Sequence, residues 1–483
     1  MAARPLLRTV EPPASGGVID GADHPGDRGS EPDLIDAGLR SEVRQRLDWP
    51  SVVVVALLAL SAGAVPLLVV IDRPDHYVLP KLLALWAVLT VSAVFLACCR
   101  REGVGPLGRT PAGLSIPIGL FGLLVVIATV RSDRPRMSLL GEPSQHQGLL
   151  SVLLYLGFFI VAALVVTNTR RLRWIHRLVA AGGTAVAACA IAQRQGWDPW
   201  WGSILPVDRV MATIGQPNAL ATYLVLTMSV TVGLLAWDRR GRRAIVAAAL
   251  VAQMVALAMT ASRGGYLGAL TAAVIGLGLW WSGRERFHRS GVLRPAVVVA
   301  VVLVAGVLWA PTRGVFTDSA RRLATSTNVA ADESVRNHLD QWRVAAHLVR
   351  EHPLSGVGPE RFPDAWVIHR DHVLAPDRVA YFDQYRVESP HNLALEVAAG
   401  SGLPAALCLF WAFGAIAIRL RRAARPETLS ILVGMAGFLV ASSFMTAEVT
   451  SSWLMWTLMG AGVGVGVGVR ATGSAAGRAA RLK

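Results

Sequence analysis

Charged residues are scarce in this sequence, and lysine is nearly absent. Asp, Glu, Lys and Arg make up 16% of the 483 residues, against about 25% in ordinary soluble proteins. Lysine occurs only as Lys81 and Lys483, and 53% of the residues are hydrophobic. Because these apolar residues form runs of the ~20 residues that a helix needs to cross a bilayer, the composition excludes a soluble domain and indicates an integral membrane protein.

Cysteine is scarce too. Cys98, Cys99, Cys189 and Cys408 lie in or at the end of apolar runs without a CxxC pair, so we expect neither a disulfide framework nor a cysteine metal site. The net charge of +15 would suit nucleic acid. However, the arginines lie in short clusters between apolar runs, as membrane orientation signals do. We therefore expect no nucleic-acid partner.

The apolar runs predict an all-α, polytopic bundle, because backbone groups cannot stay unpaired in lipid and helices satisfy them internally. We expect about twelve transmembrane spans, the last of them glycine-rich. They are predicted at 51–70, 79–98, 114–130, 148–167, 174–193, 218–237, 244–261, 265–282, 293–310, 391–418, 428–447 and 453–469.

Arginine clusters flank every second connection, which predicts that both termini are cytoplasmic. Residues 1–48, rich in Pro, Gly, Asp and Arg, are expected to form a disordered cytoplasmic tail, and 470–483 a second cytoplasmic tail. One outer connection departs from the rule, since it carries Arg131, Arg134 and Arg136.

The long polar segment 311–390 is predicted to face outward, between spans 1–9 (49–310) and spans 10–12 (391–469). Polar segments of this length are usually functional or disordered. Within it, 333–351 has helical periodicity and predicts an amphipathic helix lying on the membrane or against the bundle. Its expected apolar face consists of Val335, Leu339, Trp342, Ala346 and Val349.

Three polar residues lie where predicted outer connections meet the membrane. Arg263 is in the short turn Ser262-Arg263-Gly264-Gly265, Arg209 precedes the segment GQPNALATYL, and His391 stands where the large loop re-enters. Arginine binds phosphate oxygens, and histidine accepts protons near neutral pH. The plainer alternative for each is an interfacial or loop side chain without a chemical role.

Two further patterns are weak. Gly356 and Gly358 in HPLSGVGPERF could cradle phosphate oxygens, but a structural turn explains them better. His369 and His372 resemble a metal pair, yet no further ligand set stands out. We expect no metal site and no cofactor.

Five segments in this order resemble the O-antigen ligase and O-antigen polymerase family. They are SLLGEPSQHQGLL (138–150), GQPNALATYL, TASRGGYLG, the loop ending in HPLSGVGPERF, and PHNLALEVAAGSGLPA. The resemblance implies a GT-C-like bundle in the bacterial inner membrane. It also implies a metal-independent glycosyltransferase whose partners are membrane lipids, a polyprenyl-diphosphate-linked glycan donor and a glycan or lipid acceptor.

The resemblance also implies roles for particular residues. His391 matches the catalytic histidine of the family, Arg263 and Arg209 match its diphosphate-binding arginines, and Arg336 matches a recurrent position in the loop. The entry motif departs from the usual pattern, because residue 216 is Gln. The chemistry agrees, since arginines neutralise a diphosphate leaving group and a histidine removes the proton of an acceptor hydroxyl.

Other functions stay open. A multi-span transporter would show internal repeats and ionisable groups near the middle of the membrane; no repeat is visible, and Glu396 and Glu448 are the acidic exceptions in the spans. A sensor or scaffold would not require Arg263 and His391 together. Within the family, ligase, polymerase and protein glycosylation all remain open.

Overall fold

The structure, a computed structural model, describes residues 49–71, 75–101, 112–203, 209–237, 240–282, 332–445 and 448–481. In these ranges helices dominate, and one short antiparallel pair joins β1 (Trp197–Asp198) to β2 (Gly202–Ser203). The all-α prediction is confirmed. The predicted tail 1–48 and the predicted ninth span 293–310 lie outside the described residues.

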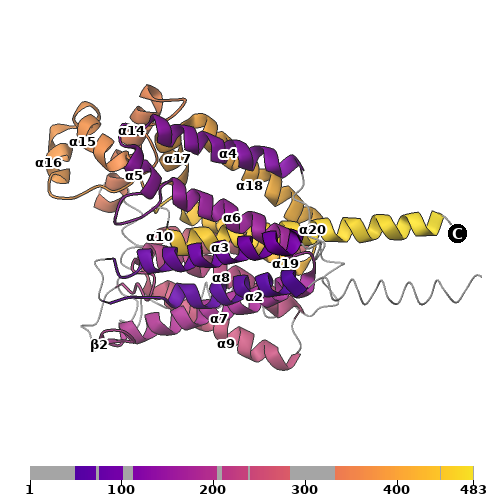
Figure 1. Ribbon diagram of the computed structural model, residues 1–483. Coiled ribbons are helices and arrows are strands. Elements are labelled where there is room, and N and C mark those ends of the chain that lie inside the picture. Colours follow the sequence, from indigo (N-terminus) through magenta and orange to yellow (C-terminus); the bar gives the residue numbers. More distant parts are fainter. Residues whose placement is uncertain are drawn as a thin grey trace, which may run out of the picture. The chain divides into compact units, whose positions relative to one another are not determined.

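Long helices run side by side and form the bundle (Figure 1). Seven of the described helices are long and apolar enough to cross a membrane, and three shorter apolar helices accompany them. Apart from the tenth predicted span, these helices stand at the predicted positions, so an integral membrane protein is confirmed, while the total of about twelve spans stays a prediction. The bundle helices are α2 (Trp49–Ala64), α3 (Val78–Arg101), α4 (Ala112–Arg131), α6 (Leu149–Val165), α7 (Thr169–Arg194), α8 (Pro217–Trp237), α9 (Arg240–Met259), α10 (Arg263–Ser282), α18 (Leu403–Ala423), α19 (Pro426–Ala441) and α20 (Val449–Arg481).

The connections predicted to lie outside gather at one end of the bundle, which we call the loop end. Among the described residues it comprises 68–71, 75–77, 132–148, 195–203, 209–216, 260–262, 332–402, 442–445 and 448. Side-chain and backbone contacts join Asp75 to His146, Lys81 to Thr213, Val210 to Met259, Arg263 to Asp332 and Leu393 to Ser442. These contacts bring the connections together at one end, as the alternation of the arginine clusters predicts. That this end faces the outside of the membrane stays a prediction.

The tenth predicted span, 391–418, is divided and needs correction. Its first part is a separate short helix, α17 (Leu393–Ser401), and the spanning helix α18 begins only at Leu403. Gly402 separates them with a φ of 87°, a conformation that glycine adopts without steric cost. A side chain there would also collide with the backbone of Leu354. His391 therefore precedes a short helix at the loop end and is not part of a membrane span.

The glycine-rich helix α20 lies in the centre of the bundle, and its residues 449–465 are buried. A Cβ at Gly460 would collide with the carbonyl oxygen of Phe159 on α6, and one at Gly464 would lie 2.5 Å from the carbonyl oxygen of Val166. Small residues four apart let two helix backbones approach closely, which favours association in membranes. Gly460 and Gly464 of the last predicted span are therefore packing residues.

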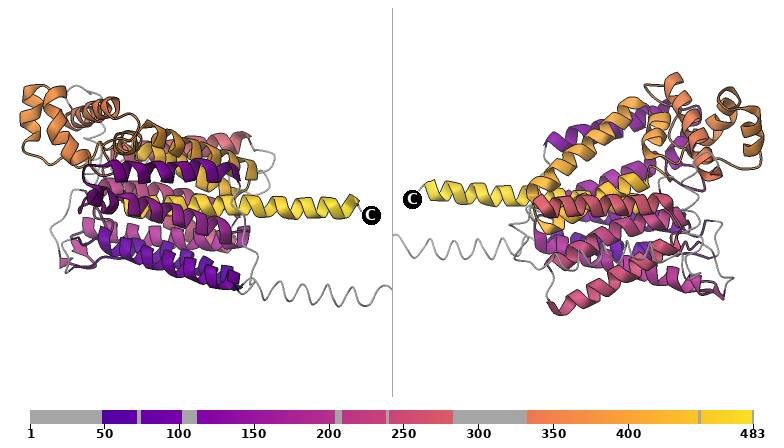
Figure 2. Two further views of the ribbon diagram at one scale, coloured as in Figure 1. Left: turned by 45° about the horizontal axis from the view of Figure 1, so that its top comes forward. Right: turned by 180° about the vertical axis from the view of Figure 1, so that it is seen from behind.

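The loop domain, residues 332–390, holds α14 (Glu333–Glu351), α15 (Phe362–Val373) and α16 (Pro376–Phe382). Both views of Figure 2 show it at the loop end of the bundle. The predicted helix 333–351 is present with the expected bounds; on its predicted apolar face Leu339 is exposed and the other four residues are half-buried, so its contact with the membrane or the bundle stays a prediction. The buried face lies on roughly the opposite side and consists of Asp340, Gln341, Val344, Ala345 and Leu348.

A buried arginine explains why polar residues occupy that face. Arg378 of α16 donates to Asp340 at 2.7 Å, to Glu333 at 2.6 Å and to Asn337 at 2.7 Å. Its guanidinium also lies 4.7 Å from the ring centroid of Tyr381. Because a buried charge must be paired, α14 turns Asp340 inward towards Arg378. A hydrophobic pattern alone cannot predict that this polar side of α14 is buried.

Substituting Gly460 by Ala should destabilise the protein, because the new methyl group forces α20 away from α6. Overpacking of this kind typically costs about 1–3 kcal/mol. Gly466→Ala on the same helix is the matched control, since a Cβ there meets nothing within 4 Å. Thermal unfolding in detergent should show a lower melting temperature for Gly460→Ala than for Gly466→Ala. Equal melting temperatures of the two variants would contradict the close packing of α20 against α6.

Candidate functional site

The turn that carries Arg263 is fixed by close packing. Ser262 Oγ accepts the amide of Gly265 at 3.2 Å and thereby caps α10. A Cβ on Gly264 would lie 2.9 Å from Phe444 Cβ, and a Cβ on Gly265 would lie 2.5 Å from Ala221 Cβ. Both glycines are thus required by neighbouring side chains, and they hold Arg263 at the first position of α10.

Arg263 forms an ion pair with Asp332, in which Nη2 lies 2.6 Å from Oδ2. Asp332 is also the N-cap of α14, where its side chain accepts the amides of Ser334 and Val335. The hydrogen-bonding guanidinium of Arg263 lowers the pKa of Asp332 below its ordinary 3.8, so the carboxylate is charged at neutral pH. This ion pair connects the bundle to the loop domain.

Arg209 is held against the same turn. Its Nε donates to the carbonyl of Thr260 at 2.9 Å, and its Nη2 donates to Oδ1 of Asn218 at 2.7 Å. Asn218, in the first turn of α8, thus binds this guanidinium, and α8 begins at Pro217. Gln216, the residue that departs from the family motif, is exposed.

His391 has the geometry of a general base. Its Nδ1 lies 3.0 Å from the carbonyl oxygen of Ser389. Because a carbonyl oxygen only accepts hydrogen bonds, Nδ1 carries the hydrogen, which leaves the lone pair on Nε2. Burial, followed by the nearby charge of His338, lowers the pKa of His391 below its ordinary 6.5. The imidazole is therefore neutral, and able to take a proton, at pH 7.

The first turns of α14 bring the predicted site residues together. The helix is capped by Asp332, the partner of Arg263, and the ring of His338 lies 5.5 Å from the ring of His391. Arg336 lies between these two contacts on the same helix; it is exposed, and its Nη1 is 3.9 Å from Glu333. With Arg209 bound beside Arg263, the four predicted residues gather around one helix end.

The glycines of HPLSGVGPERF do not bind phosphate through their amides. The amide of Gly356 donates to the carbonyl of His352 at 3.0 Å, and that of Gly358 donates to the carbonyl of Gly400 at 2.9 Å. Their φ angles of 64° and 107° suit glycine. The alternative of a structural turn is thus confirmed, and this turn fixes α17, the helix that follows His391.

The segment 138–150 holds the chain that leads to His391. Glu142 forms an ion pair with Arg386, and Gln145 donates to Glu388 at 2.9 Å. Both partners precede His391 by only a few residues. The segment therefore helps to fix the chain just before His391.

Glu360 adds a carboxyl group that is neutral at pH 7. Burial, followed by the nearby Glu396, raises the pKa of Glu360 to about 8. Its Oε2 accepts the amide of Glu142 at 3.2 Å.

Sequence reasoning missed Asp332 and His338. The position of Asp332 before a helical pattern is a readable N-cap signal, but its pairing with Arg263 depends on tertiary structure. His338 lies on the helix predicted from periodicity, where nothing in the spacing distinguishes it from a solvent-exposed side chain.

Comparison with known proteins agrees with this arrangement. Residues 246–410 match the model of the family described as O-antigen ligase. Among curated proteins, none matches the chain. The matched region includes Arg263, Arg336 and His391, whereas Arg209 precedes it. The chain thus carries a domain of the O-antigen ligase family, which confirms the resemblance seen in its sequence.

Proposed function

We propose that the protein transfers a glycan from a polyprenyl-diphosphate carrier to an acceptor hydroxyl at the outer face of the bacterial inner membrane. The observation that carries this proposal is the gathering of Arg263, Arg209, Arg336 and His391 around the start of α14. The match to the O-antigen ligase family supports an enzyme of membrane glycans and does not favour a transporter.

The arginines are suited to a diphosphate. Arg263 and Arg209 stand at the loop end, where apolar helices meet the polar loop domain, so a lipid tail would lie along the helices and its diphosphate beside the guanidinium groups. Arginine stays charged and binds phosphate oxygens in pairs. Fixed positive charges stabilise the charge that develops on the leaving group.

The transfer step then needs one base. The acceptor oxygen attacks the anomeric carbon of the donor, a new C–O bond forms, and the bond from that carbon to the diphosphate breaks. The polyprenyl diphosphate leaves with the electron pair, while the hydroxyl proton passes to Nε2 of His391. The neutral state and tautomer of His391 suit this role.

Replacing His391 by Ala should slow glycan transfer by about 10²–10⁴-fold, the usual contribution of a general base. Release of polyprenyl diphosphate from a lipid-linked oligosaccharide in proteoliposomes measures the rate, and size-exclusion behaviour shows correct folding. In the wild type, the rate should rise with pH until His391 loses its proton, with a midpoint below 6.5 because its pKa is lowered. A folded His391→Ala variant with near-normal transfer would disprove the role.

The ion pair with Asp332 should compete with the donor for Arg263. Asp332→Asn removes the carboxylate charge but keeps a residue that caps helices well. If the competition is worth about 1 kcal/mol, the donor KM should fall about fivefold. Arg263→Ala should instead raise the donor KM and lower kcat.

Arg343→Ala is the matched control for these charges, because Arg343 lies on α14, is largely exposed and pairs with Asp340. It should leave the donor KM unchanged. A rise of KM in Asp332→Asn, similar to that in Arg263→Ala, would mean that the carboxylate positions the arginine and does not compete with the donor.

A further inference from the structure

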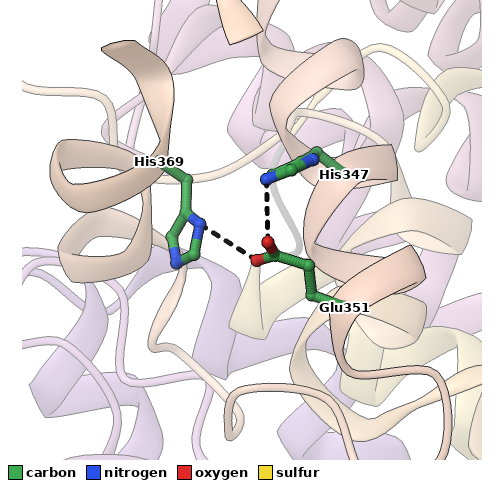
Figure 3. Close-up of side chains that lie close together, drawn as sticks. All are labelled: His347, Glu351 and His369. Carbon is green, nitrogen blue, oxygen red and sulfur yellow. Dashed lines mark ion pairs between the residues drawn. The ribbon is translucent and has the colours of Figure 1, made fainter. Parts of the chain in front are cut away.

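Two histidines and a glutamate converge at the opposite end of α14 from His338. His347 and Glu351 lie one helical turn apart on α14, and His369 faces them from α15 (Figure 3). Nε2 of His347 is 3.2 Å from Oε1 of Glu351, and Nδ1 of His369 is 3.1 Å from Oε2. The three ligand atoms all lie within 4.8 Å of one another.

We propose that His347, Glu351 and His369 bind a divalent transition-metal ion, with zinc as the best fit. Imidazole nitrogen and carboxylate oxygen are ordinary zinc ligands, and three protein ligands leave the fourth tetrahedral position to water. His347 and Glu351 supply a pair at i and i+4 on one helix face, a spacing that places two ligands on the same side.

The distances suit such a site. Ligand atoms at about 2.1 Å from a tetrahedral zinc ion lie roughly 3.4 Å apart. Each imidazole already lies close to this distance from one oxygen of Glu351, His347 from Oε1 and His369 from Oε2. The two imidazole nitrogens need to approach each other by no more than about 1.4 Å, which rotation within the staggered side-chain wells permits. All three side chains are 20–42% exposed, so they have room to turn.

Ordinary ion pairing explains the cluster less well. Glu351 would form ion pairs with both imidazoles only if both were protonated, which would place two cations beside one anion with ring centroids 5.6 Å apart; neutral rings would each donate one hydrogen bond to it instead. One metal ion replaces both protons and removes the repulsion between the rings. This ligand set differs from the weak pair His369 and His372 in the sequence, and it departs from the expectation of no metal site.

The ion would link α14 to α15. The turn between these helices, 352–361, packs against α17 through the amides of Val357 and Gly358. His347 is nine residues beyond His338, about 14 Å along the helix axis. The metal would therefore stiffen the loop domain without reaching the proposed transfer site, and this inference does not depend on the proposed function.

The test uses the full-length chain in detergent, purified through a tag without histidine and stripped of metal. Equilibrium dialysis against ZnCl2 followed by elemental analysis gives the stoichiometry, and thermal unfolding with and without ZnCl2 gives the stabilisation. The variants are His347→Ala, His369→Ala and the conservative Glu351→Gln. His76→Ala is the matched control, because His76 also lies at the loop end but outside the cluster.

Wild type and His76→Ala should bind one zinc ion per chain at this site and unfold at a higher temperature with zinc. Each cluster variant should bind zinc about tenfold more weakly or worse and lose the stabilisation. Equal binding and equal stabilisation in the wild type and in folded Glu351→Gln and His369→Ala variants would overturn the proposal, as would the absence of zinc binding in the wild type.

Discussion

The proposed site lies where the first turn of α14 meets the turn between α9 and α10, and the ion pair between Arg263 and Asp332 joins these two parts. Arg263 begins a bundle helix, and Asp332 caps the helix that carries Arg336 and His338. Because an arginine held by two packed glycines cannot easily move, the start of α14 is fixed over the turn between α9 and α10. The position of His391 relative to the arginines follows from this contact through His338.

The bilayer explains why these polar groups meet at the loop end. Backbone and charged groups inside lipid must be satisfied within the protein. The arginines and the histidine of the proposed site therefore lie at helix ends. The bundle contributes a rigid support, since glycines on α20 let it pack directly against the α6 backbone. Division of the tenth predicted span at Gly402 keeps His391 outside the membrane segment.

Much of this arrangement is readable from the sequence. Apolar runs predicted the helices, and the order of five segments identified the family, because each signal is local. The side of α14 that packs into the loop domain was not predicted, since the pairing of Asp340 with Arg378 comes from another helix. For the same reason, the roles of Asn218, Gly356 and Gly358 became clear only from their partners far along the chain. The roles of the four site residues remain predictions.

The account requires the loop end to face the outside of the cell. In a variant whose native cysteines are replaced by serine, a cysteine is introduced either at Leu354, which is 75% exposed in the loop domain, or at Arg422 near the opposite end of α18. Spheroplasts are then treated with a membrane-impermeant maleimide. Labelling at residue 354 and protection at residue 422 are predicted; the reverse pattern would contradict the account.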